Sequence, residues 1–144
     1  MRSVEVLVQK HGLFIEQAIR TRLYDKGTYA DGKQIKTYRA QGSDVYSPFT
    51  IQLKKQEGQP TDRVTLKNEG ELYESFNVKT ESSGFAVEFE DDKEDGKVSD
   101  NIPDMDRAIE LGGDGLKDLQ SLIIKDLQDD FIKEAKEAIL YGVK

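Results

Sequence analysis

Apolar side chains recur every three or four positions near the start of the chain, which predicts an amphipathic helix over residues 4–25. Ser3 fits an N-terminal cap for this helix, and Gly27 fits its C-terminal stop. The β-branched run 4–8 also fits a short strand, so the sequence leaves two structures open for these residues: the first turns of the helix or a strand. The apolar positions are Val4, Leu7, Val8, Phe14, Ile15, Ala18, Ile19 and Leu23.

Residues 27–47 have no periodicity and contain several glycines and aspartates, which predicts a long loop. A loop of this length in a compact domain is commonly functional or ordered by a partner. Tyrosine suits an interface because it joins a large apolar ring to a polar tip. The rings can equally fold back onto the core of the chain itself, and both interpretations stay open. The tyrosines in or beside the loop are Tyr24, Tyr29, Tyr38 and Tyr46.

A short helix is predicted after the loop. Ser47 fits its N-cap and Pro48 its first helical position, where the missing N–H costs nothing. The helix should run to about Gln56 and stop at Gly58.

The alternation of apolar and polar residues predicts a β-hairpin over residues 76–80 and 85–90, on both sides of a turn that contains glycine. Its apolar face should be buried, and it consists of Phe76, Val78, Phe85, Val87 and Phe89. Three shorter elements are expected before the hairpin: a strand over 63–66, a turn over 68–70 and a helical turn over 71–75.

Residues 91–101 are expected to form an acidic loop. The run 91–96 places alternate carboxylates ahead of a glycine, as calcium loops do. Lys93 occupies the position of the third ligand, however, and Ile102 occupies the position of the bidentate glutamate. The sequence therefore predicts no calcium site here.

The chain should end in a long helix. A short helix is expected over 103–109, and from Leu116 the apolar residues keep helical spacing to the end. About 26 residues at 1.5 Å each would span on the order of 40 Å. The adjacent aspartates at 129–130 mark a place where this helix can break. A small sheet does not cover such a length, so part of the apolar stripe is expected to face another subunit.

Composition agrees with a single folded domain over residues 1–144. Leu, Ile, Val and Phe make up roughly a quarter of the chain, more than the ~20% below which chains usually stay disordered. Cysteine is absent, which excludes disulfides, a thiolate nucleophile and a sulfur-ligated zinc site. No run of apolar residues is long enough for a membrane span or a secretory signal, so an intracellular protein without a membrane anchor is expected.

Charge is unevenly distributed along the chain, whose formal net charge is −7. Residues 1–80 carry 13 basic and 10 acidic side chains, and residues 81–144 carry 8 and 18. An acidic chain repels phosphate backbones, which argues against sequence-specific binding of nucleic acid. A bipolar chain can instead pack head-to-tail with copies of itself.

No arrangement of residues indicates an enzyme. His11 provides the sole imidazole and falls on the apolar stripe of the first helix, where a histidine satisfied by neighbours is expected rather than a general base. The sequence contains no phosphate-binding loop, no dinucleotide-binding glycine motif and no zinc-protease motif. Carboxylate-only acid–base chemistry is the remaining enzymatic hypothesis, and no cofactor or metal is expected.

A family resemblance extends these inferences. Its elements are Gly32-Lys33, the Ser47–Thr50 segment followed by Lys54-Lys55, the Gly70-x-Leu72-x-x-Ser75-Phe76 element, and the strands 78–80 and 85–90. With these elements the chain resembles the small head-tail joining or tail-completion proteins of tailed bacteriophages, the phage virion morphogenesis family. The resemblance covers about 65 residues, from Lys26 to Phe89.

The resemblance implies an α+β fold: an N-terminal helix, a long loop, a small antiparallel sheet with a hairpin, and a long C-terminal helix packed on the sheet. It also implies a non-enzymatic virion protein, made in the host cytoplasm, that forms a homo-oligomeric ring at the neck or tail. The partners would be portal, adaptor or tail proteins of the same virion. A monomeric acidic binding module or inhibitor acting on a basic partner is the alternative.

Two groups of residues follow as candidates. Gly70, Leu72 and Phe76 are expected to be structural, since Leu72 and Phe76 lie four apart and can cover the sheet. The candidate interface consists of Tyr29, Tyr38, Tyr46, Phe49, Lys54, Lys55 and Phe131.

Overall fold

The computed structural model describes residues 1–67, 70–81, 84–93 and 96–142. The α+β class, with N-terminal helices, an antiparallel hairpin and a long C-terminal helix, is confirmed. The elements in chain order are α1 (Val4–Lys10), α2 (Gly12–Lys26), α3 (Pro48–Gln56), α4 (Glu71–Glu74), β1 (Asn77–Glu81), β2 (Gly84–Glu88), β3 (Asp92–Lys93), β4 (Gly96–Lys97), the 3-10 helix η1 (Val98–Asp100), α5 (Met105–Ala108) and α6 (Gly113–Tyr141).

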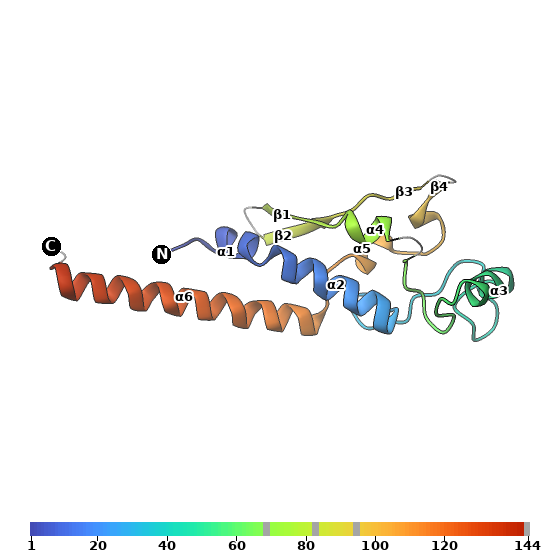
Figure 1. Cartoon of the computed structure of the whole chain (residues 1–144), viewed down its shortest axis with the longest axis horizontal. Coiled ribbons are helices and arrows are strands. Elements are labelled where there is room, and N and C mark those ends of the chain that lie inside the picture. Colours follow the sequence, from blue (N-terminus) through green and yellow to red (C-terminus); the bar gives the residue numbers. More distant parts are fainter. Residues whose placement is uncertain (68–69, 82–83, 94–95, 143–144) are drawn as a thin grey trace.

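The main elements stack in three layers (Figure 1). The hairpin β1–β2 lies on one side of α1 and α2, and α6 runs along their other side. The sequence predicts that the C-terminal helix packs on the sheet, whereas the structure places α1 and α2 between them. Helix α2 packs closely against both the hairpin and α6, since Gly12 lies beside Val78 of β1 and Ala18 lies beside Gly115 of α6.

The N-terminal helix is interrupted at His11, so the predicted helix over 4–25 is two helices. Both predicted ends are confirmed. The Ser3 side chain accepts a hydrogen bond from the Val6 N–H at 3.2 Å, and Gly27 ends α2 in the left-handed conformation. The alternative strand at residues 4–8 is wrong, because these residues are helical.

The core is centred on α2. Ile15, Ile19 and Leu23 are spaced by four and have no exposed surface. They belong to one cluster with residues of the hairpin layer and of α6, including Phe76, Val78 and Leu119. Burial of this face accounts for the predicted apolar periodicity.

The predicted hairpin is confirmed, with Val78 paired to Val87 and Thr80 to Phe85. Its turn at 82–83 lies outside the described residues. Phe76 and Val78 are buried, and the three later members of the apolar face are half-buried. The hairpin therefore covers α1 and α2 most closely along β1.

The predicted strand over 63–66 is wrong, since these residues have no strand pairing. Two tyrosine hydroxyls bind the Thr65 backbone instead: its N–H donates to Tyr46 Oη at 3.2 Å, and the Tyr73 hydroxyl donates to its carbonyl. Both Val64 and Thr65 are buried. Side chains thus provide the hydrogen bonds that a neighbouring strand would provide.

The three positions expected to be structural lie at the start of the hairpin layer. Gly70 precedes α4 with φ of 94°, a conformation that favours glycine. Leu72 and Phe76 are buried in the core. The other residues of the predicted turn, 68–69, lie outside the described residues, and the helical turn over 71–75 is confirmed as α4.

The acidic segment 91–101 is more regular than a loop. It contains the two-residue strands β3 and β4 and the 3-10 helix η1. Asp91 accepts hydrogen bonds from the Ser99 N–H, at 2.7 Å, and from the Ser99 hydroxyl, which ties the two ends of the segment together.

Helix α6 runs unbroken from Gly113 to Tyr141, so the predicted break at 129–130 does not occur. Asp130 accepts hydrogen bonds from the backbone N–H and the guanidinium of Arg2, so a partner from the N-terminal segment stabilises this aspartate within the helix. The 29 residues of α6 span about 43 Å at 1.5 Å per residue.

The segment 27–47 has one isolated bridge, between Thr28 and Gln34, and no helix or strand, as predicted. It is nevertheless packed onto the body, because Tyr29, Ile35 and Val45 are buried.

Candidate interaction surfaces

The candidate interface residues divide between the core and two exposed regions. Tyr29 and Tyr46 are buried, with exposed fractions of 7% and 5%. Their rings therefore fold back onto the core of their own chain. Tyr29 donates its hydroxyl proton to the Pro103 carbonyl at 2.5 Å, and burial raises the pKa of both phenols. Tyr38 is 65% exposed, although its backbone N–H donates to the Asn101 carbonyl.

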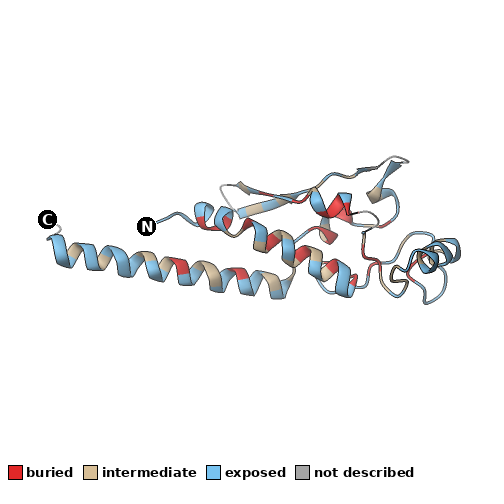
Figure 2. Cartoon of the chain, in the orientation of Figure 1, coloured by how far each residue is buried: buried red, intermediate tan, exposed pale blue. Residues whose placement is uncertain are grey.

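The first exposed region surrounds α3, at one end of the molecule (Figures 1 and 2). The Ser47 side chain caps this helix by accepting from the Thr50 N–H, as predicted. Phe49 and Leu53 are four positions apart, hence on one face of the helix, and they are 69% and 40% exposed. The end of the molecule at α3 therefore presents an apolar ridge to solvent.

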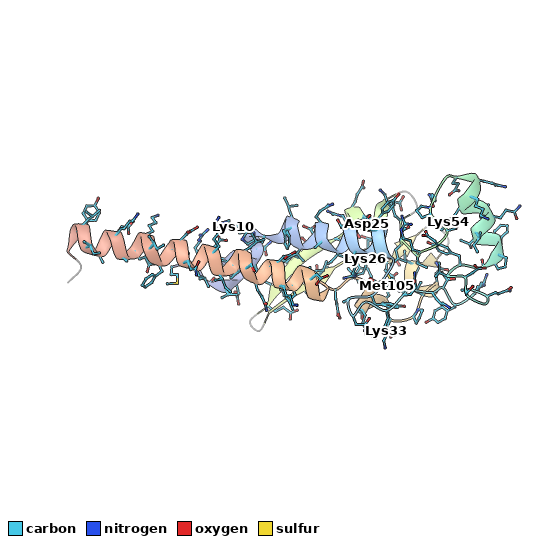
Figure 3. The ribbon with its side chains drawn as sticks, turned by 90° about the horizontal axis from the view of Figure 1, so that it is seen from below. Lys10, Asp25, Lys26, Lys33, Lys54 and Met105 are labelled. Atoms are coloured by element: carbon cyan, nitrogen blue, oxygen red, sulfur yellow. The ribbon has the colours of Figure 1, made fainter. Side chains whose placement is uncertain are left out.

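The two lysines of α3 differ in their surroundings. Lys54 lies 4.8 Å from the ring centre of the buried Tyr46 and donates to Gln59 Oε1 at 3.0 Å. Its burial lowers the pKa of the ammonium. Lys55 is exposed beside it. Figure 3 shows Lys54 at this end of the molecule. Lys54 thus helps to hold α3 on the body, and Lys55 is the more accessible cation.

Ion pairs attach α6 to the N-terminal helices. His11 Nε2 lies 2.6 Å from Asp126 Oδ2, and Lys10 donates to Asp126 Oδ1 at 2.9 Å. Figure 3 shows Lys10 beside α6. One turn further along α6, Arg2 binds both carboxylate oxygens of Asp130. His11 is therefore a histidine satisfied by a neighbour, as expected, and it links the α1–α2 junction to α6.

These contacts give a pH-dependent prediction. Hydrogen bonds from His11, followed by those from Lys10, hold the pKa of Asp126 below its usual value of 3.8. The carboxylate therefore stabilises the fold above about pH 4, and this contribution is lost as pH falls through the lowered pKa. Asp126→Asn should lower the urea midpoint at pH 7, with a smaller difference from wild type at pH 3.

Asp129→Asn is the matched control, because Asp129 is an exposed carboxylate on the same turn of α6. It should leave the urea midpoint unchanged at both pH values. If Asp126→Asn lowered the urea midpoint by the same amount at pH 7 and at pH 3, the charged carboxylate of Asp126 would not be what stabilises the fold.

The second exposed region is the distal part of α6, where Phe131 is 64% exposed (Figure 2). Sequence reasoning selected Phe131 and missed its apolar neighbours. These are Ile132, Ile139, Leu140 and Tyr141, which are between 50% and 82% exposed. The signal that could have found them is apolar residues on nearly every side of the last three turns.

Two open grooves complete the surface. One, of about 600 Å³, lies between α2, the start of loop 27–47 and the glycine-rich start of α6. The other, of about 450 Å³, lies beside α5, where three carboxylates (Asp91, Asp104 and Asp106) and the guanidinium of Arg107 surround Phe89 and Met105. Among the described residues, no group of three or more His, Cys, Asp or Glu side chains is arranged to hold a metal ion.

No family model matches the chain, and no curated protein or solved structure is significantly similar to it. Within the described ranges, the helices lack the combination of length and apolar character that a membrane span requires.

Proposed function

We propose that this protein is a non-enzymatic structural component of a tailed-phage virion and acts as a ring of identical copies at the neck or tail. Its partners would be further copies of the chain and portal, adaptor or tail proteins of the same particle. The observation that carries this proposal is an elongated subunit (Figure 1), which has exposed apolar side chains at both ends.

A ring requires two different contact surfaces on each subunit, since every copy binds the next through a heterologous contact. The α3 ridge, with Phe49 and Leu53, and the distal part of α6, with Phe131 and Ile139, are two such surfaces on separate elements. A neck ring must also bind proteins above and below it. Apolar surface of this extent is typical of proteins that bind partners.

The acidic surface favours the alternative function, a binding module for a basic partner. Residues 88–106 contain nine acidic and two basic side chains. The groove beside α5 adds the apolar side chains of Phe89 and Met105 to this charge, and its three carboxylates outnumber its one cation, Arg107. A lysine or arginine side chain, with its apolar stem and cationic head, fits such a surface.

The purified chain decides between the two functions. A connector should form rings in negative-stain images and elute in size-exclusion chromatography with the mass of several copies. Because apolar contacts would carry the assembly, raising salt from 50 mM to 500 mM should not dissolve it. A chain that stays monomeric at every concentration, and loses affinity for polylysine as salt rises, would establish the acidic binding module instead.

A further inference from the structure

Residues 47–63, which include α3, form an arm that is anchored to the body at its two ends. We call this segment the α3 arm. None of residues 47–63 is buried, and Figure 1 shows α3 beyond the other elements at one end of the molecule. Buried residues begin immediately on either side, with Tyr46 before the arm and Val64 after it. The α3 arm therefore has no core of its own, and its position depends on the contacts at its base.

A hydrogen bond joins the two ends of the α3 arm. The Thr65 N–H donates to Tyr46 Oη at 3.2 Å, and both residues are buried. The Thr65 carbonyl accepts from the Tyr73 hydroxyl of α4, so Thr65 also ties the base of the arm to the hairpin layer. We call these two hydrogen bonds the clasp. Since a buried backbone group that loses its partner is costly, the clasp holds the arm in one orientation.

The residue that follows the clasp has a strained backbone. Leu66 adopts φ of 56°, in the left-handed region that a branched L side chain rarely occupies. Both neighbours of Leu66 are fixed, because the clasp holds Thr65 and the Lys67 N–H donates to Thr65 Oγ1 at 3.2 Å. The Lys67 ammonium also lies 5.4 Å and 5.9 Å from the ring centres of Tyr24 and Tyr73. These contacts keep Leu66 strained, and opening of the clasp would let it relax.

The α3 arm covers part of the core at its base. Ile51 packs against the core cluster, and the Lys54 ammonium lies 4.8 Å from the ring centre of Tyr46. Phe49 and Leu53 lie on the other side of α3, about 160–200° around the helix from Ile51. If the arm turned away from the body, it would uncover the Tyr46 ring and keep its own apolar ridge accessible.

We propose that the clasp is a conformational switch: it holds the α3 arm against the body in the single chain and opens when a neighbouring copy binds the arm. The strain at Leu66 lowers the cost of opening, because it is present only while the clasp is closed. The neighbour gains contact with the Tyr46 ring only when the arm is open, and this difference in contact shifts the equilibrium. The role of the neighbour rests on the proposed ring, whereas the opening of the clasp is a property of the single chain.

Exchange of the Thr65 amide hydrogen in the isolated chain measures how often the clasp opens. Leu66→Ala removes most of the side chain and keeps the strain, whereas Leu66→Gly removes both. A closed clasp is then more stable with glycine, so the protection of the Thr65 amide should be about five-fold higher in Leu66→Gly than in Leu66→Ala. Equal protection in the two variants, or higher protection in Leu66→Ala, would overturn the switch.

The Ile19 amide is the control for local opening, because Ile19 has no exposed surface and lies at the centre of α2. It should exchange only when the whole fold opens. Thr65 should therefore be less protected than Ile19 in the wild-type chain. Equal protection of Thr65 and Ile19 would mean that the clasp opens only with the whole fold, which would also overturn the switch.

Spin labels follow the arm directly, because the chain has no cysteine of its own. Double electron–electron resonance between exposed positions Gln52→Cys on the arm and Lys117→Cys on α6 gives their distance distribution. It should broaden when Tyr46→Phe removes the oxygen that accepts from Thr65. Labels at Ala86→Cys on β2 and Lys117→Cys are the control pair on the body, and their distribution should not change. An unchanged arm pair, or equal broadening in both pairs, would contradict the role of Tyr46 in the switch.

Assembly separates this inference from the proposed ring. If a neighbour binds the open arm, Leu66→Gly should self-associate about five-fold more weakly than Leu66→Ala in sedimentation velocity, since glycine stabilises the closed clasp. Rings that form equally well in both variants would overturn opening on binding and leave the proposed function intact. A wild-type chain that is monomeric at every concentration would overturn the proposed function and the role of the neighbour, while the protection of Thr65 would still decide whether the clasp opens.

Discussion

Gly27→Ala should destabilise the fold by about 3–5 kcal/mol, a large part of the ~5–15 kcal/mol that holds a typical domain together. Gly27 ends α2 with φ of 61°, where an L side chain is strained by about 1 kcal/mol or more. An added Cβ would also lie 2.7 Å from Arg63 Cβ and 2.9 Å from the Val64 backbone nitrogen. Because neither the Arg63 Cβ nor the backbone of this segment can move away freely, overpacking adds to the strain. Thermal unfolding followed by circular dichroism measures the loss.

Gly42→Ala separates the conformational strain from the overpacking. Gly42 has nearly the same φ, 60°, but no atom of the described residues lies within 4 Å of an added Cβ. This variant should lose only about 1 kcal/mol, which is the conformational cost alone. Equal losses in the two variants would show that the close approach of residues 63–64 to Gly27 contributes nothing to stability.

The caps and the hairpin could be predicted from the sequence because the signals that form them are local. Ser3 and Ser47 each cap a helix whose first residues follow directly, and both accept the expected backbone N–H. Alternation of side chains over 76–90 likewise depends only on which face of the strand is covered. These elements were therefore found within a few residues of their actual ends.

The errors occur where a distant residue decides the structure. Val64 and Thr65 have the β-branched character of a strand, but the hydroxyls of Tyr46 and Tyr73 bind the Thr65 backbone, so the segment needs no partner strand. Similarly, the apolar spacing of residues 4–25 continues through the break at His11, so the pattern could not reveal it.

The candidate surfaces could be predicted only in part for the same reason. The length of the last helix indicates excess apolar surface, and it led to Phe131. Which side of α6 is free becomes clear only when Asp126 and Asp130 are seen to bind α1 and the N-terminal segment. The tyrosines of loop 27–47 have identical chemistry, and their burial depends on contacts with residues far along the chain, such as Pro103 and Thr65.

Arg22→Met should cost about 3 kcal/mol of stability, since hydrogen bonds to a charged donor contribute roughly 1.5–3 kcal/mol each and not all are fully buried. The Arg22 guanidinium donates to the carbonyls of Thr28, at 3.0 Å, Glu110, at 2.5 Å, and Ala108. It thereby joins α2 to the start of loop 27–47 and to the connection between α5 and α6. Burial lowers the pKa of the guanidinium, yet arginine stays charged at neutral pH. Methionine keeps the packing of the apolar stem and removes all three donors.

The loss in Arg22→Met should be local as well as global. Hydrogen exchange should accelerate most in residues 28–35 and 108–116, because these two segments share Arg22 as their common donor. Arg39→Met, at an exposed arginine of the same loop, is the control and should change stability by less than about 0.5 kcal/mol. Arg22→Lys should recover only part of the loss, since a single ammonium cannot reproduce the fork that reaches three carbonyls. If Arg22→Lys were as stable as wild type, a single positive charge would be enough to join α2 to its neighbours. That result would contradict the role proposed for the three hydrogen bonds of the guanidinium.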